Sequence, residues 1–180
     1  MKSAVLLIDL QRDFLAGPGA RMPVSAQSTE QVLRVANAIL AGRRLAESLR
    51  FMVVNEFPAS AHVPNFFRRH AAIAGSQGAE LDPRLDHAEN IKRISKSSAS
   101  AFTNPELNEV LRASGTEHLY VLGVMTEGCV RATVVDAIRR GFRVTVIDNG
   151  IASNAEWKHR LGVWLMKRAG AEFEGISVDS

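Results

Sequence analysis

The sequence predicts a single α/β domain over residues 1–180, built on a doubly wound parallel β-sheet of about six strands with helices on both faces. Two observations support this fold class. Short apolar runs alternate with segments of helical periodicity, and the connections between them are mostly short, as in repeated right-handed strand–helix–strand units. The first strand is apolar throughout, which is typical of a strand covered on both faces.

In the first half of the chain, periodicity predicts three strands and one helix. Residues 4–8 (AVLLI) form the first strand, and apolar residues at helical spacing predict a helix over 28–49. Residues 51–54 and 91–94 are the second and third strands. The segment 55–85 is irregular and contains several Pro and Gly residues, and an irregular stretch of that length in a compact domain is usually a lid or binding loop.

The second half alternates more regularly. Pro105 is a favourable first residue for a helix that ends near Gly115, and either Thr103 or Asn104 could cap it. The remaining elements are strands at 118–123, 142–147 and 171–178 and helices at 128–140 and 154–169.

Composition argues against several functional classes. Lys and Arg number 22 against 19 Asp and Glu, a net charge of +3, and the two signs are interspersed rather than gathered into the basic stripe expected of a nucleic-acid-binding protein. No apolar run approaches the roughly 20 residues of a membrane span. A single cysteine cannot form an internal disulfide, so we expect a cytoplasmic protein. Together with the charge pattern and the short apolar runs, this predicts a protein that binds a small molecule and neither nucleic acid nor membrane.

Three chemically useful residues fall at predicted strand ends. Asp9 ends the first strand, Lys96 lies just past the third, and Cys129 opens the helix after the fourth. Ligands of such sheets bind beyond the carboxyl ends of the strands, so we expect these side chains to meet there.

The segment GVMTEGCV, residues 123–130, resembles a nucleophile elbow, in which a tight turn presents the nucleophile at the start of a helix. The helix dipole should lower the pKa of Cys129, and backbone N–H groups of the turn could hold an oxyanion. Asp9 could act as general acid–base, and Lys96 could stabilise the charged forms of both groups. The alternatives are a packed cysteine and an aspartate that pairs with Arg12.

Other chemistries have weaker support. His62 or His70 in the long loop could pair with Cys129, whereas His118 begins its strand at the opposite edge, and His87 and His159 are not at a strand end of the ligand face. The sequence has no metal-ligand spacing and no nucleotide-binding glycine motif, so no metal and no cofactor are expected.

Three segments together resemble the isochorismatase-like cysteine hydrolases, which include nicotinamidases, N-carbamoylsarcosine amidases and ureidoacrylate or biuret hydrolases. These segments are LLIDLQRDF, ISKSSASAF and GVMTEGCVRATVVDAIRRGFRVTVIDNGIAS. The resemblance runs from about residue 3 to residue 153, and GSQGAELDPRL at 75–85 also fits.

The resemblance implies a catalytic triad of Asp9, Lys96 and Cys129. Lys96 is preferred to Lys92 because it stands six residues before Phe102, as the lysine of the family usually does. The family also implies that members form oligomers, so we expect at least a homodimer.

Further features carried over from the family lie around the nucleophile. A cis peptide bond should join Val124 and Met125, and the backbone N–H groups of Met125 and Cys129 should form the oxyanion hole. Phe14 matches a position that often lines the substrate pocket; the alternative is that Phe14 is a core residue.

The sequence departs from the family where metal-binding nicotinamidases carry their ligands. Asn55 and Phe57 occupy the expected Asp and His positions, which leaves His62 isolated and argues against a nicotinamidase assignment. True isochorismatases generally lack the cysteine, so Cys129 favours amide chemistry.

The prediction is therefore a cysteine hydrolase that cleaves a C–N bond of a small amide, ureido or imide substrate through a Cys129 thioester. One alternative is a catalytically inactive family member that acts as a binding or regulatory protein. Another is a thiol-redox protein, which is disfavoured because the chain has no second cysteine to resolve an oxidised thiol.

Overall fold

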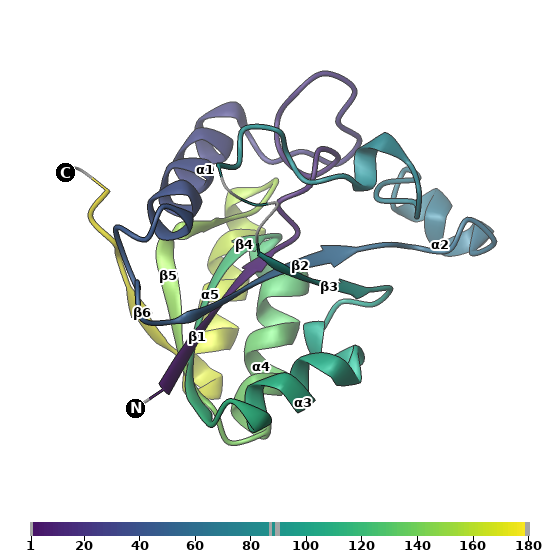
Figure 1. The fold of residues 1–180 in the computed structure, drawn as a ribbon. Helices are drawn as coiled ribbons and strands as arrows, with labels where there is room; N and C mark the ends of the chain where they lie inside the picture. The colour runs from purple at the N-terminus through teal and green to yellow at the C-terminus, as the bar shows by residue number, and fades with distance from the viewer. Residues whose placement is uncertain (1, 87, 89–90, 179–180) are drawn as a thin grey trace.

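Six parallel strands form one sheet in the order β3-β2-β1-β4-β5-β6 (Figure 1). The structure is a computed structural model and describes residues 2–86, 88 and 91–178. The strands are β1 (Lys2–Ile8), β2 (Leu49–Asn55), β3 (Lys92–Lys96), β4 (Thr116–Val124), β5 (Arg143–Ala152) and β6 (Glu172–Glu174). This order reverses between β1 and β4, and the predicted doubly wound parallel sheet is confirmed.

Helices cover both faces of the sheet (Figure 1). The α-helices are α1 (Ala26–Leu40), α2 (His62–Phe67), α3 (Pro105–Ala113), α4 (Arg131–Arg139) and α5 (Glu156–Ala169). Short 3₁₀ segments lie at η1 (Gln77–Ala79) and η3 (Ala101–Thr103), and a π-helical turn, η4 (Thr126–Val130), joins β4 to α4.

Two apolar cores lie on opposite faces, and the strands supply them alternately because successive side chains point to opposite sides. Val5 and Leu7 of β1 face the core that α1 covers, whereas Leu6 and Ile8 face the core beneath α3, α4 and α5. All four side chains are fully buried. The apolar run at residues 4–8 is thus the central strand that its composition predicts.

Three predicted boundaries are wrong. The helix expected to reach residue 49 ends at Leu40, and Gly42 beyond it has a left-handed φ of 73°. The helix expected from residue 128 begins at Arg131 because η4 intervenes. The last strand stops at Glu174, because the Asn149 side chain, rather than the sheet, bonds both the N–H and the carbonyl of Ile176.

The other predicted elements occur with small shifts at their ends. Asn104 caps α3, its side chain accepting from the Glu106 N–H. β5 runs on to Ala152, five residues beyond the predicted end.

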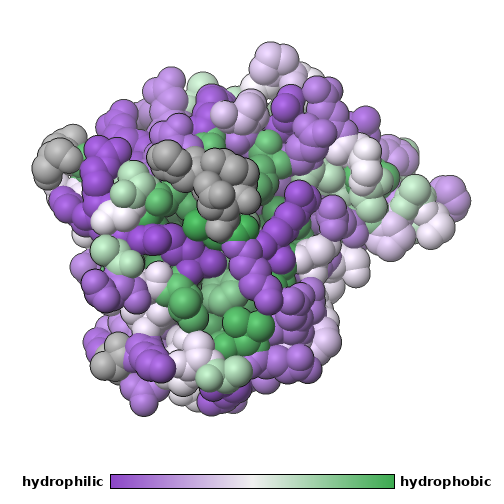
Figure 2. All heavy atoms as spheres, viewed as in Figure 1, coloured by the Kyte–Doolittle hydropathy of each residue, from purple (hydrophilic) through white to green (hydrophobic). Residues whose placement is uncertain are grey.

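The irregular segment 55–85 contains α2, which projects from the body as an arm (Figure 1). Figure 2 shows apolar and polar side chains mixed on this arm. Val63, Phe66 and Phe67 are among its exposed residues. In the part of the chain that the structure describes, no helix is long and apolar enough to cross a membrane.

Candidate active site

Asp9 leaves β1 in a left-handed conformation with φ of 55°, and its N–H donates to the Val53 carbonyl of β2 at 2.8 Å. Aspartate is one of the few non-glycine residues that adopt this conformation readily. The side chain lies within the structure, where the residue is only 1% exposed. The first strand is thus followed directly by a buried carboxylate whose backbone is bonded to β2.

Lys96 is the last residue of β3 and reaches Asp9 across β2. Its Nζ lies 3.1 Å from Asp9 Oδ2 and also donates to the Ser98 carbonyl at 3.2 Å. The lysine side chain is fully buried, so little water screens this ion pair. Lys92, the other lysine of β3, instead pairs with Glu106 at the surface.

Cys129 lies in η4, beyond the carboxyl end of β4. Gly123 sets the position of this strand end: its φ is 127°, and a Cβ there would lie 2.0 Å from the Ile8 carbonyl oxygen. Only glycine therefore lets the end of β4 approach the residue before Asp9 this closely. A cis peptide bond joins Val124 to Met125 directly before the turn.

Side chains that follow β5 or belong to α5 and α4 hold this turn in place. Ser153 Oγ donates to Glu127 Oε2 at 2.6 Å, and Thr126 Oγ1 and His159 Nδ1 lie 3.0 Å apart. The Arg131 side chain also donates to the Glu127 carbonyl at 2.8 Å.

Asn55, the last residue of β2, is a fourth member of the cluster that the sequence reasoning missed. Its Nδ2 donates to Asp9 Oδ2 at 2.7 Å and to Cys129 Sγ at 3.5 Å. The residue is 1% exposed. The signal that found Asp9 and Lys96, a polar residue at a strand end, applies equally to Asn55, which was read only as a missing metal ligand.

Burial disfavours the charged forms of Asp9 and Cys129 and favours their neutral forms. Burial raises the pKa of Asp9 above its usual value, and the Lys96 ammonium counteracts this rise. Burial, reinforced by the negative charge of Asp9, raises the pKa of Cys129 to about 12, although Lys96 and Asn55 act in the opposite direction. The expected lowering of the thiol pKa is wrong, because burial is the largest contribution and outweighs the favourable effect of Lys96.

The two oxygens of Asp9 have different surroundings. Oδ2 accepts from both Lys96 and Asn55, whereas Oδ1 is buried and has no hydrogen-bond partner among the described residues. The arrangement therefore combines a protonated thiol, a carboxylate with one free acceptor and a fixed ammonium.

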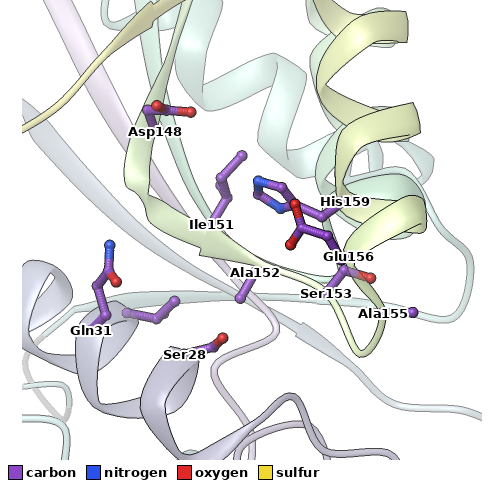
Figure 3. A pocket seen from close by; sticks show the side chains of 10 residues that line it. Ser28, Gln31, Asp148, Ile151, Ala152, Ser153, Ala155, Glu156 and His159 are labelled. Atoms are coloured by element: carbon purple, nitrogen blue, oxygen red, sulfur yellow. The ribbon is translucent and has the colours of Figure 1, made fainter.

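A pocket of about 230 Å³ lies between α1, β5 and α5 (Figure 3). In Figure 3, Glu156 and His159 of α5 point toward the end of β5, and Ser28 and Gln31 of α1 form the facing wall. None of the four clustered residues lines this pocket. Ser153 and His159 both line it and bond to η4, so its wall also supports the turn that carries Cys129.

The remaining candidates lie elsewhere. Phe14 is 7% exposed and packs in the core on the α1 side. His62 and His70 are exposed, at the start of α2 and just beyond it, and His87 lies outside the described residues.

Comparison with known proteins identifies the family. Residues 3–176 match the isochorismatase domain. The chain belongs to the isochorismatase family. A protein of Arabidopsis thaliana described as a probable inactive nicotinamidase is 32% identical over 94% of this chain and 90% of its own length. The nicotinamidase of Escherichia coli is 29% identical over 82% of this chain and 81% of its own length.

Solved structures show the same architecture for this isochorismatase family member. The pyrazinamidase of Pyrococcus horikoshii in complex with zinc is 26% identical and superposes with a TM-score of 0.83, covering 98% of this chain and all (100%) of that one.

A metal ion does not fit the corresponding part of this isochorismatase family member. Asn55 donates its amide N–H groups to Asp9 and Cys129, Phe57 is an apolar core residue beneath the Arg68 guanidinium, and His62 is exposed. Over residues 2–86, 88 and 91–178, no three His, Cys, Asp or Glu side chains are placed to hold a metal ion together.

Proposed function

We propose that this protein is a cysteine hydrolase that cleaves a C–N bond of a small amide, ureido or imide substrate. The observation that carries the proposal is the cluster of buried Asp9 and Lys96 with half-buried Cys129 at the carboxyl edge of the sheet, in which Asp9 keeps one unpartnered oxygen. The amidase names of several relatives support the reaction class.

In the first half of the reaction, the Cys129 thiol transfers its proton to Asp9 Oδ1 as the sulfur attacks the carbonyl carbon of the substrate. The backbone N–H groups of Met125 and Cys129 stabilise the oxyanion that forms. When the C–N bond breaks, Asp9 returns the proton to the departing nitrogen, and a thioester remains on Cys129.

Water completes the reaction. Asp9 takes a proton from the water as the water oxygen attacks the thioester carbon. The C–S bond then breaks, and the sulfur recovers the proton from Asp9. The net change is one amide and one water converted to one acid and one amine or ammonia. The Lys96 ammonium stabilises Asp9 in its ionised form.

The raised thiol pKa fits this scheme. A thiol that is protonated at rest needs a base beside it, and proton transfer to Asp9 coupled to attack avoids a free thiolate in a buried site. Thioester formation thus depends on Asp9 as much as on Cys129.

A screen of small amides, ureas and imides by ammonia release tests the proposal. Replacing Cys129 with Ala or Ser, or Lys96 with Ala, should abolish turnover of any substrate found. Lys92→Ala is a matched control, because Lys92 lies on the same strand but pairs with Glu106 at the surface. Full activity in the Cys129→Ala variant would rule out the mechanism.

The second candidate is a binding protein without catalysis, which the probable inactive status of the Arabidopsis relative favours. Its signature would be no turnover of any screened compound together with a Cys129 that iodoacetamide does not alkylate. We also propose that the protein forms a homo-oligomer, which its mass in solution would show.

A further inference from the structure

Asn55 links the nucleophile to its base through a single amide group. The side-chain nitrogen has two hydrogens, and the structure gives it two acceptors, Asp9 Oδ2 at 2.7 Å and Cys129 Sγ at 3.5 Å. The orientation of the amide follows from chemistry, because its oxygen would repel the Asp9 carboxylate if the group were reversed. Asn55 therefore presents N–H donors to both reacting groups.

The backbone of Asn55 is fixed by Gln11. Gln11 Oε1 accepts from the Asn55 N–H at 2.8 Å, and Gln11 Nε2 donates to the Asn55 carbonyl at 2.7 Å. Gln11 Nε2 also donates to the Ala79 carbonyl at 2.7 Å, and Gln11 is fully buried. Gln11 thus fixes the Asn55 backbone through both its N–H and its carbonyl, and so fixes the position from which the Asn55 amide reaches the site.

The other charged groups cannot replace this contact. The charges that face the sulfur are Asp9 from β1 and Lys96 from β3. Lys96 donates to Asp9 and to the Ser98 carbonyl, so among the residues that the structure describes the side chain that donates a hydrogen bond to the sulfur is Asn55. An amide donor also adds no charge, and so serves the site equally when the negative charge is on Asp9 and when it is on the sulfur.

We propose that Asn55 is a positioning residue of the hydrolase, which holds the Asp9 carboxylate toward the thiol and stabilises the sulfur as it becomes a thiolate. The inference rests on the roles proposed above for Asp9 and Cys129. As the proton moves from sulfur to Asp9, the Asn55 bond to the sulfur becomes charge-assisted and strengthens.

Alkylation of Cys129 by iodoacetamide measures this effect without a known substrate. Cys129 is the only cysteine, so intact-protein mass spectrometry reports the reaction of one thiol. Below the thiol pKa, each unit by which that pKa rises reduces the thiolate fraction, and with it the alkylation rate, tenfold. The rate is therefore measured from pH 7 to pH 9 for the native chain and for each variant.

Asn55→Ala should slow alkylation by about 10- to 100-fold at every pH in this range, because a hydrogen bond to a charged group is lost. Asn55→Asp keeps the shape of the side chain but replaces a donor with a second carboxylate beside Asp9, and should slow the reaction further. Because aspartate has the same shape as asparagine, the Asn55→Asp variant can be measured even if Asn55→Ala fails to fold.

Asn65→Ala is the matched control. Asn65 is also an asparagine that is 1% exposed, and its Nδ2 donates to the Pro58 carbonyl, away from the cluster. This variant should alkylate at the native rate.

The direction of the change separates positioning from a merely structural role. Removing a side chain that only fills space would open a path to the sulfur and make alkylation faster. Folded Asn55 variants, checked by thermal melting, that alkylate at the native rate or faster would overturn the inference. That result would leave the hydrolase proposal standing, since loss of turnover in Cys129→Ala tests it separately.

Discussion

Gly162 of α5 packs directly against the backbone of the turn that carries Cys129. A Cβ at this position would lie 2.9 Å from both the Cα and the N of Glu127 and 3.0 Å from the carbonyl carbon of Thr126. These neighbours are backbone atoms, which cannot rotate away as the end of a side chain can. Gly162→Ala must therefore move α5 outward or shift η4.

The two contributions to stability in Gly162→Ala have opposite signs. Forcing a methyl group into a packed contact typically costs about 1–3 kcal/mol, whereas alanine in place of glycine inside a helix gains about 1 kcal/mol. The net loss should be about 0–2 kcal/mol, which lowers the melting temperature by at most about 8 °C for a domain of this size. The effect on activity should be larger, because a shift of about 1 Å in a reacting group can cost about 100-fold in rate.

Thermal melting and kcat/KM of the purified variant test this prediction together. Leu161→Ala, one residue away on α5 with a half-exposed side chain, controls for general disturbance of the helix and should keep native activity. A Gly162→Ala protein with native kcat/KM would refute the reasoning, because it would show that the turn tolerates a displaced α5 without loss of alignment.

Three further predictions concern pH, the lysine and the core. Because the pKa of Cys129 is raised from 9.0 to about 12, the native state keeps a proton that the unfolded chain loses, and the free energy of unfolding should fall by up to about 4 kcal/mol as pH rises from 9 to 12. Lys96→Met should raise the pKa of Asp9 further, since its cation is gone, and reduce kcat at neutral pH by at least about 100-fold. Phe14→Ala should destabilise the fold by about 3–5 kcal/mol, as expected for a core residue.

Each of these has a direct measurement. Urea unfolding of the native chain and of Cys129→Ser at pH 9 to 12 isolates the thiol, because the serine variant should lack its share of the decline, and equal slopes would contradict the prediction. A kcat profile against pH reports on Lys96→Met, where native rates would show that Asp9 does not need the cation. A Phe14→Ala protein of native stability but raised KM would place Phe14 in the substrate pocket instead.

The sequence was sufficient to predict which catalytic candidates would meet. Asp9 and Lys96 are far apart in the chain, but both end parallel strands, and the carboxyl ends of parallel strands lie at one edge of the sheet. The apolar run at residues 4–8 also identified the central strand, because a strand that is apolar throughout is typically covered on both faces.

Features that depend on packing could not be predicted in this way. The thiol pKa was misjudged because the local argument from a helix start considers one favourable field, whereas burial among surrounding elements outweighs it. The end of α1 at Leu40 was missed because apolar residues beyond it, including Leu45, keep helical spacing while the chain already turns. The position of Asn55 at a strand end is visible in the sequence, but the hydrogen bonds of its amide to Asp9 and Cys129 depend on how the strands pack.

The left-handed backbone conformation at position 9 limits which residues can replace the aspartate there. Apart from glycine, asparagine is the other residue that tolerates this conformation readily, and it matches aspartate in shape. Asparagine at position 9 would still offer an oxygen to Lys96 but could no longer take a proton from the thiol. For the hydrolase proposed above, this one substitution would give a protein that binds the same compounds without cleaving them, at a position whose backbone conformation accepts both residues.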